Sequence, residues 1–182
     1  CRVGQMDYKP NGRTYWGGII LINKNEFCEH IRLCEKAMYA LAFSIVKNNT
    51  DAEEVISESI YRAYKNLETL KYKKFFKTWL LHIVHNTAVE MIRNNSNILL
   101  TDEPIDIADN GNENEITTKL TLYNAINHLK QPYCTVIVLF YYEDLSISSI
   151  AQITGANAVT VKKQLSRARM MLKELLKEDF KE

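Results

Sequence analysis

The clearest alternation of apolar and polar positions lies between residues 146 and 172. Apolar or small residues recur there at the spacing of one helix face, at Ile147, Ile150, Ala151 and Thr154. Ser146 can cap this helix, and Gly155 can end it by turning the chain through positive φ. Asn157 can cap a second helix whose inward residues are Val161, Leu165, Ala168 and Leu172. The pattern predicts two short helices joined by a sharp turn.

The other face of the second predicted helix is polar and basic, and it carries no acid before Glu174. Its residues are Thr160, Lys162, Lys163, Gln164, Ser166, Arg167 and Arg169. This is the helix-turn-helix arrangement, in which the second helix fits the major groove of DNA. An ordinary helical hairpin with a solvated basic face is the alternative.

The segment from Phe27 to Arg93 also shows helical spacing, so the sequence predicts an all-α protein. A first helix contains Met38, Leu41, Ala42 and Ile45, and Thr50-x-x-Glu53 then has the form of a capping box. The next helix is expected to bury Ala52, Val55, Ile56, Ile60, Ala63 and Leu67. A third, Phe76 to Arg93, is expected to bury Phe76, Trp79, Leu80, Ile83, Val84, Thr87 and Met91.

Bases alternate with aromatic residues between 71 and 77, in the order KYKKFFK. This mixture suits a single nucleic-acid strand, because cations hold phosphates while aromatic faces stack on unpaired bases. We expect Phe76 to belong to the core, whereas Tyr72, Phe75 and the four lysines have no evident core role.

The net charge of +1 conceals an uneven distribution. Residues 94–116 contain six acids and no base, which leaves 23 bases against 16 acids elsewhere. This segment is rich in Asn and lacks helical periodicity, so it is predicted to be a flexible acidic linker between two small helical domains. Fully extended, it could span up to ~80 Å. An acidic loop that has no function would explain the sequence of this segment equally well.

Several classes of protein are disfavoured by the sequence. No apolar run approaches the ~20 residues of a membrane span, and no signal peptide is evident. Cys28-x-His30-x3-Cys34 would crowd three ligands on one helix without a fourth, so we expect free thiols, no metal and no cofactor. Residues 1–24 fit no helical period. They could be a leader translated before a start near Leu21, a short strand or an artificial tail.

Two blocks of the chain resemble the bacterial RNA polymerase sigma factors of the sigma-70 family, in its extracytoplasmic-function group. The first block has DAEEVISE at 51–58, TWLLHIVHN at 78–86 and Arg93. The second has Leu129-x2-Pro132, SSIA at 148–151, Gly155, TVK at 160–162 and LSRAR at 165–169. The sequence departs from the family pattern at Ser57, at Val159 and at residues 163–164.

The resemblance implies four parts: an N-terminal extension (1–24), sigma region 2 (25–93), the linker (94–116) and sigma region 4 (117–182). Region 2 would bind the clamp helices of core RNA polymerase through Asp51, Glu53, Glu54, Glu58, Arg62 and Lys65. It would also melt the minus-10 element, with Lys71, Tyr72, Lys73, Lys74, Phe75, Lys77, His82, Asn86 and Arg93 holding the open strand. Region 4 would bind the polymerase flap, and it would read minus-35 DNA with the second predicted helix together with Ser146 and Ser148.

The implied protein is a cytoplasmic bacterial transcription factor that catalyses no reaction and is controlled by an anti-sigma factor. Two rival functions stay open at this stage. One is a helix-turn-helix regulator that never contacts polymerase, and the other is a sigma-like decoy that binds a regulator but no DNA. An enzyme is disfavoured, because no Ser/His/Asp arrangement and no phosphate-binding glycine loop is evident.

Overall fold

The structure, a computed structural model, describes residues 7–8, 14–16, 19–20, 22–96 and 124–179. Three helices form a first module (residues 22–96): α1 (Lys24–Val46), α2 (Asn49–Lys65) and α3 (Phe76–Ser96), with single 3-10 turns at Leu67–Thr69 and Lys73–Phe75. A second module (residues 124–179) contains a helical stretch at 124–128, then α5 (Tyr133–Ile137), which continues into a π-helical turn at Val138–Tyr142. It ends with α6 (Ile147–Thr154) and α7 (Ala158–Asp179). The helical prediction is therefore confirmed for both modules.

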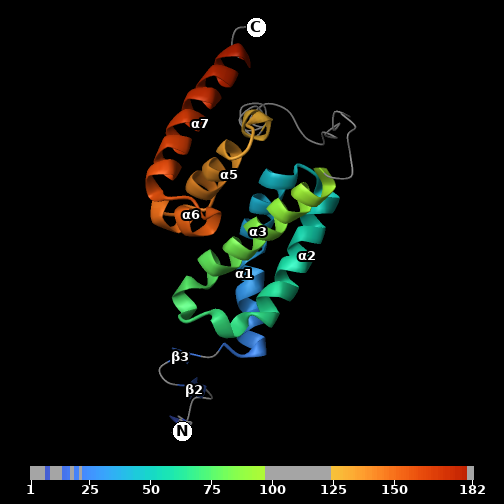
Figure 1. The fold of residues 1–182 in the computed structure, drawn as a ribbon, viewed down its shortest axis with the longest axis vertical. Coiled ribbons are helices and arrows are strands. Elements are labelled where there is room, and N and C mark those ends of the chain that lie inside the picture. The colour runs from blue at the N-terminus through green and yellow to red at the C-terminus, as the bar shows by residue number, and fades with distance from the viewer. Residues whose placement is uncertain (1–6, 9–13, 17–18, 21, 97–123, 180–182) are drawn as a thin grey trace, which may run out of the picture.

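Before α1, the described residues include a small antiparallel sheet in the order β1-β2-β3, of which β2 and β3 are labelled in Figure 1. Its strands are β1 (Asp7–Tyr8), β2 (Thr14–Trp16) and β3 (Ile19–Ile20). Tyr15 of β2 is paired with Asp7 on one side and with Ile20 on the other. The strands agree with one of the three alternatives considered for this segment.

The boundary between α1 and α2 corrects one sequence prediction. Lys47 adopts a left-handed conformation with φ of 58° and donates its backbone N–H to the carbonyl of Phe43, which ends α1. The side-chain oxygen of Asn48 then accepts a hydrogen bond of 3.1 Å from the N–H of Asp51 and caps α2. The capping box at Thr50 is therefore wrong, because Asn48 caps at least as well and lies directly after the reversal of the chain.

The turn between α6 and α7 follows the sequence prediction closely. Ser146 caps α6 by accepting from the N–H of Ser149, and Asn157 accepts from the N–H of Thr160 at 2.7 Å. Gly155 has φ of 70°, the left-handed conformation in which an L side chain is strained. Of the residues expected to face inward, Ile150, Val161, Leu165 and Ala168 are buried, and Ile147, Ala151, Thr154 and Leu172 are half-buried. Ile153 is also buried, which the sequence pattern did not predict.

Gly155→Ala should lower the free energy of unfolding by about 1–2 kcal/mol. A Cβ at this position would contact nothing within 4 Å, so the cost should come from backbone conformation alone. Thermal unfolding should show a fall in Tm, while Gly155→Asn should fall less because Asn tolerates left-handed backbone. An Ala variant as stable as the parent chain would show that the turn relaxes to another conformation.

The two modules share one hydrophobic core. Figure 1 shows α6 beside α3, and α1 also packs against α5 and the π-helical turn. At this module interface the side-chain amide of Gln131 donates to the carbonyl of Ser44 at 2.6 Å, and Lys77 forms an ion pair of 2.8 Å with Glu143. The sequence indicated two domains but did not indicate this contact between them.

The predicted linker overlaps the first module by three residues. α3 continues through Ser96, beyond the boundary expected after Arg93. Residues 97–116 of the acidic segment lie outside the described residues. Within the described ranges, no helix is both long enough and apolar enough to cross a membrane.

Candidate nucleic-acid interface

The outward face of α7 is one of the two basic surfaces predicted from the sequence. Lys162, Lys163, Ser166 and Arg167 are exposed along it, opposite the buried Val161, Leu165 and Ala168. Thr160 and Gln164 are half-buried at its edges, while Ser146 and Ser148 are exposed at the start of α6. The helix-turn-helix geometry therefore presents most of the predicted residues to solvent together.

Arg169 differs from the other basic residues of α7. Its Nε donates to the hydroxyl of Tyr141 at 2.8 Å, and its guanidinium lies 5.8 Å from the ring centroids of both Phe140 and Tyr141. Hydrogen bonding and cation–π attraction thus hold this side chain against its own module. The sequence pattern missed this contact because the partners are 28 residues apart.

Two exposed apolar side chains on the same face were not predicted. Val159 is 62% exposed in the first turn of α7, and Met170 is 63% exposed three turns later. The departure of Val159 from the family pattern was the only sequence signal for either residue.

The basic-aromatic loop before α3 exposes Tyr72 and Phe75, whose rings meet edge to face with centroids 6.1 Å apart. Lys74 Nζ lies 5.0 Å from the centroid of the Phe75 ring, and Lys71 is also exposed. Phe76 is buried, as expected for a core residue. The loop therefore offers two aromatic faces beside at least two solvent-accessible cations.

The other two loop lysines form ion pairs in this structure. Lys73 Nζ lies 3.0 Å from a carboxylate oxygen of Glu26 on α1, and Lys77 pairs with Glu143 across the module interface. These contacts join the loop to its surroundings and reduce the positive charge that it offers to a ligand.

On α3, a chain of hydrogen bonds runs from His85 to the second module. His82 Nδ1 lies 2.9 Å from the carbonyl of Ile153 and must donate to it, so its Nε2 accepts from the amide of Asn86 at 3.1 Å. Asn86 Oδ1 accepts in turn from His85 Nδ1 at 3.3 Å. Burial lowers the pKa of His85 and favours the neutral ring. Arg93 lies exposed further along α3.

The N-terminal half of α3 thus faces α6 at the module interface. A cleft of about 280 Å³ opens there, lined by Phe75, Thr78, Trp79, His82 and Gln152. Two residues of the predicted minus-10 set, Phe75 and His82, therefore lie next to the helix-turn-helix in this arrangement.

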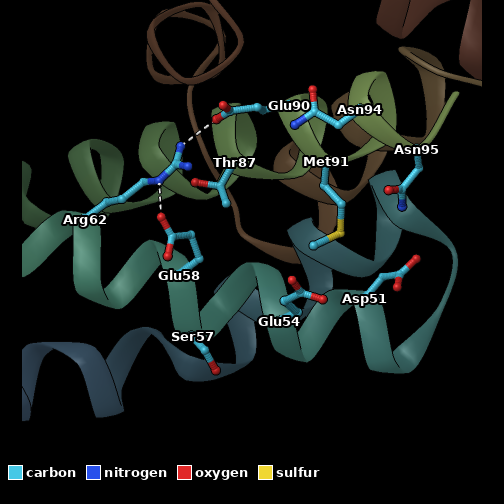
Figure 2. A pocket seen from close by; sticks show the side chains of 10 residues that line it. All are labelled: Asp51, Glu54, Ser57, Glu58, Arg62, Thr87, Glu90, Met91, Asn94 and Asn95. Atoms are coloured by element: carbon cyan, nitrogen blue, oxygen red, sulfur yellow. Dashed lines mark hydrogen bonds and ion pairs between the residues drawn. The ribbon is translucent and has the colours of Figure 1, made fainter. Parts of the chain in front are cut away.

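A second cleft, the α2/α3 groove, has a volume of about 550 Å³ (Figure 2). Its walls are formed by Asp51, Glu54, Ser57, Glu58 and Arg62 of α2 and by Thr87, Glu90, Met91, Asn94 and Asn95 of α3. Four of the six residues predicted to bind polymerase therefore lie together in one groove.

The remaining two members of that predicted set lie outside the groove lining. Glu53 is exposed on α2, and Lys65 Nζ lies 4.5 Å from the centroid of the Tyr61 ring. The structure therefore separates the expected surface into a groove and two residues beside it.

Arg62 joins the two walls of the groove. Its Nε donates to Glu58 and its Nη1 to Glu90, each at 2.6 Å, as Figure 2 shows. The hydrogen bond from Arg62 lowers the pKa of Glu90, and the same contacts raise the pKa of Arg62. Sequence reasoning missed Glu90, since its partner lies 28 residues away and no local pattern links them.

Comparison with known proteins places both modules in one family. Residues 30–98 match the family model "Sigma-70 region 2", and residues 119–172 match "Sigma-70, region 4". The RNA polymerase sigma factor SigV of Bacillus subtilis is 38% identical over 144 residues, which cover 78% of this chain and 86% of SigV. The chain belongs to the sigma-70 family. The ECF RNA polymerase sigma factor SigW of the same organism is 28% identical and covers 86% of this chain and 91% of SigW, in agreement with the extracytoplasmic-function group.

Two solved structures share the fold of this sigma factor. The sigma factor RpoE, solved with the anti-sigma factor NepR from Bartonella quintana, superposes with a TM-score of 0.68 at 24% identity, covering 84% of this chain and 98% of RpoE. CnrH, solved with the cytosolic domain of CnrY, superposes with a TM-score of 0.64 at 21% identity. The match covers 86% of this chain and 91% of CnrH. The region 2 match contains the loop, the groove and α3, and the region 4 match contains the helix-turn-helix.

Two thiols of this sigma factor are buried near the module interface. Burial raises the pKa of Cys34 and of Cys134, and Lys47 Nζ, 3.0 Å from Cys134 Sγ, partly opposes the rise at Cys134. Both groups are therefore expected to stay protonated thiols. Cys28 is exposed while Cys34 is buried, so the two do not share one surface of α1.

Proposed function

We propose that this sigma factor binds core RNA polymerase through the α2/α3 groove and directs initiation at promoters that carry minus-10 and minus-35 elements. The observation that supports this best is the presence of two surfaces in one chain. One is the acidic groove of region 2, and the other is the exposed basic face of α7 in region 4. A regulator that never contacts polymerase would not need the groove, and a decoy would not need the basic face.

In this proposal each element has a separate task. The groove residues Asp51, Glu54, Glu58 and Arg62 engage the clamp helices, and region 4 engages the flap. The loop at 71–77, with His82, Asn86 and Arg93, holds the melted minus-10 strand through stacking and phosphate contacts. The outward residues of α7 read the minus-35 element in the major groove.

The chain catalyses no bond change in this scheme. It lowers the free energy of the open promoter by binding the unpaired strand more tightly than the duplex, which shifts the equilibrium between the two states. Its site of action is the cytoplasm, where bacterial promoters and polymerase are found. An anti-sigma factor is the proposed regulator. It is supported by the partners in the two solved structures described above, an anti-sigma factor in one and the cytosolic domain of CnrY in the other.

Run-off transcription with core polymerase tests the proposal. The protein should confer promoter-specific transcripts on core enzyme, whereas without core enzyme it should bind the same promoter duplex weakly at physiological salt. Weak binding is expected because the near-neutral net charge gives little non-specific attraction. The residues proposed to hold the minus-10 strand add nothing on duplex DNA, because they are proposed to bind only the melted strand. Tight promoter binding by the free protein, with no transcript on addition of core enzyme, would support the helix-turn-helix regulator instead.

A further inference from the structure

Val159 lies at the centre of the outward face of α7. With 3.6 residues per turn, the position opposite the buried stripe of Val161, Leu165 and Ala168 falls between Val159 and Lys163, which are one turn apart. Val159 is in the first turn of the helix and is 62% exposed. A β-branched side chain thus projects from the part of a recognition helix that contacts base edges.

The surroundings of Val159 match the electrostatics of DNA. Lys162, Lys163 and Arg167 are exposed around it, and no carboxylate occurs on α7 before Glu174. Cations at these positions can meet phosphates on either side of the groove and bring the helix into contact with the bases. A protein partner of mixed surface charge would fit this face less well than a polyanion.

The chemistry of the valine side chain restricts what it can recognise. It offers neither a hydrogen-bond donor nor an acceptor, so placing it against the amino or carbonyl edge of a base would leave that group unpaired. In the major groove only thymine presents an apolar group, its C5-methyl. The branched Cβ also restricts χ1, so little side-chain entropy is lost on contact.

We propose that Val159 selects a thymine in the minus-35 element by packing against the C5-methyl group of that base. This inference rests on the proposed function and names one base that the promoter must contain. Met170 lies eleven residues further along α7, about 16 Å away along the helix axis, so it is not among the N-terminal residues of the helix, which are the ones that contact base edges.

Uracil substitution tests the contact, because it removes only the methyl group. Promoters are first selected with the holoenzyme from a library randomised over the minus-35 element. Each thymine of the selected element is then replaced by uracil, one at a time, and holoenzyme binding is measured at fixed salt. One position should weaken binding by about fourfold, the effect of about 0.8 kcal/mol for one buried methyl-sized group.

The variant Val159→Ala completes the experiment. It should weaken binding to the thymine promoter to a similar extent, and uracil at the sensitive position should then cause no further loss. Met170→Ala is the matched control, with an equally exposed apolar residue truncated on the same helix face, and it should leave the uracil effect unchanged. Thermal unfolding of both variants checks that the fold is retained.

Two results would overturn the inference. One is that uracil weakens binding to the same extent in the parent protein and in the Val159→Ala variant, so that the two losses are additive. The other is that no thymine in the element is sensitive to loss of its methyl group. If the holoenzyme shows no promoter-specific transcription at all, the proposed function itself fails. That result is distinct from a promoter-specific holoenzyme that is indifferent to uracil.

Discussion

The double variant Glu54→Arg/Glu58→Arg should lose affinity for core RNA polymerase by at least about tenfold. Both carboxylates line the α2/α3 groove, so the change replaces two negative charges by two positive ones at the proposed docking surface. Like charges brought together in an interface cost several kcal/mol. Co-purification with core enzyme, or a binding titration, measures the loss.

Glu53→Arg is the matched control for this prediction. It introduces the same charge on the same helix, next to Glu54 in sequence, but outside the lining of the groove. We expect it to retain binding. Equal loss in the control would show that polymerase recognises the general charge of α2 and not the groove. Circular dichroism should show unchanged helicity in all variants, since Glu53 and Glu54 are exposed and Glu58 is only partly covered.

Tyr72→Ala/Phe75→Ala should slow promoter opening by about tenfold or more, because two stacking surfaces are lost. Both rings are exposed and contact each other and Lys74, so their removal should leave the core of region 2 intact. Stacking on an unpaired base contributes about 1–3 kcal/mol per base, and the variant would lose it for two rings. The rate of open-complex formation on a duplex promoter measures the effect.

A promoter with a pre-melted minus-10 bubble separates this defect from one in duplex recognition. The bubble removes the cost of melting, so much of the activity of the Tyr72/Phe75 variant should return. Lys163→Ala alters the outward face of α7 and should keep its defect on the same template. If the bubble restores activity to the α7 variant and not to the loop variant, the roles proposed for the two elements are reversed.

The local elements of this fold were predictable because their signals lie within a few residues. Ser146 and Asn157 each accept a hydrogen bond from an N–H group three residues further on, and Gly155 turns the chain through its own φ, so all three perform the predicted task. The prediction that Thr50 caps α2 was wrong. Asn48, two residues earlier, accepts the hydrogen bond from the free N–H of Asp51 instead. Which of two nearby residues caps a helix depends on where the chain reverses direction, and the spacing of residues in the sequence does not show that position.

The long-range contacts of the candidate site were not predictable in this way. Arg62 meets Glu90 across 28 residues, and His82 meets Ile153 across 71 residues. Such pairs depend on how the helices pack against one another. Hydrophobic periodicity does not determine this packing, because sequences with the same periodicity can pack differently. The family resemblance pointed to four residues that line the groove, and the basic-aromatic pattern pointed to the loop. Neither indicated that Lys73, Lys77 and Arg169 have partners within the protein.

The hydrogen bond between His82 and Ile153 means that, under the proposed function, one imidazole makes contacts in two states that cannot form at the same time. In the packed form it donates to a backbone carbonyl of region 4, and in the open promoter complex it would face DNA. His82→Ala should therefore destabilise both the packed form of the protein and the open promoter complex. Its effect on initiation should be smaller than its effect on single-strand affinity, because the two losses oppose each other. Partial compensation of this kind is the expected signature of substitutions on the side of α3 that contacts α6.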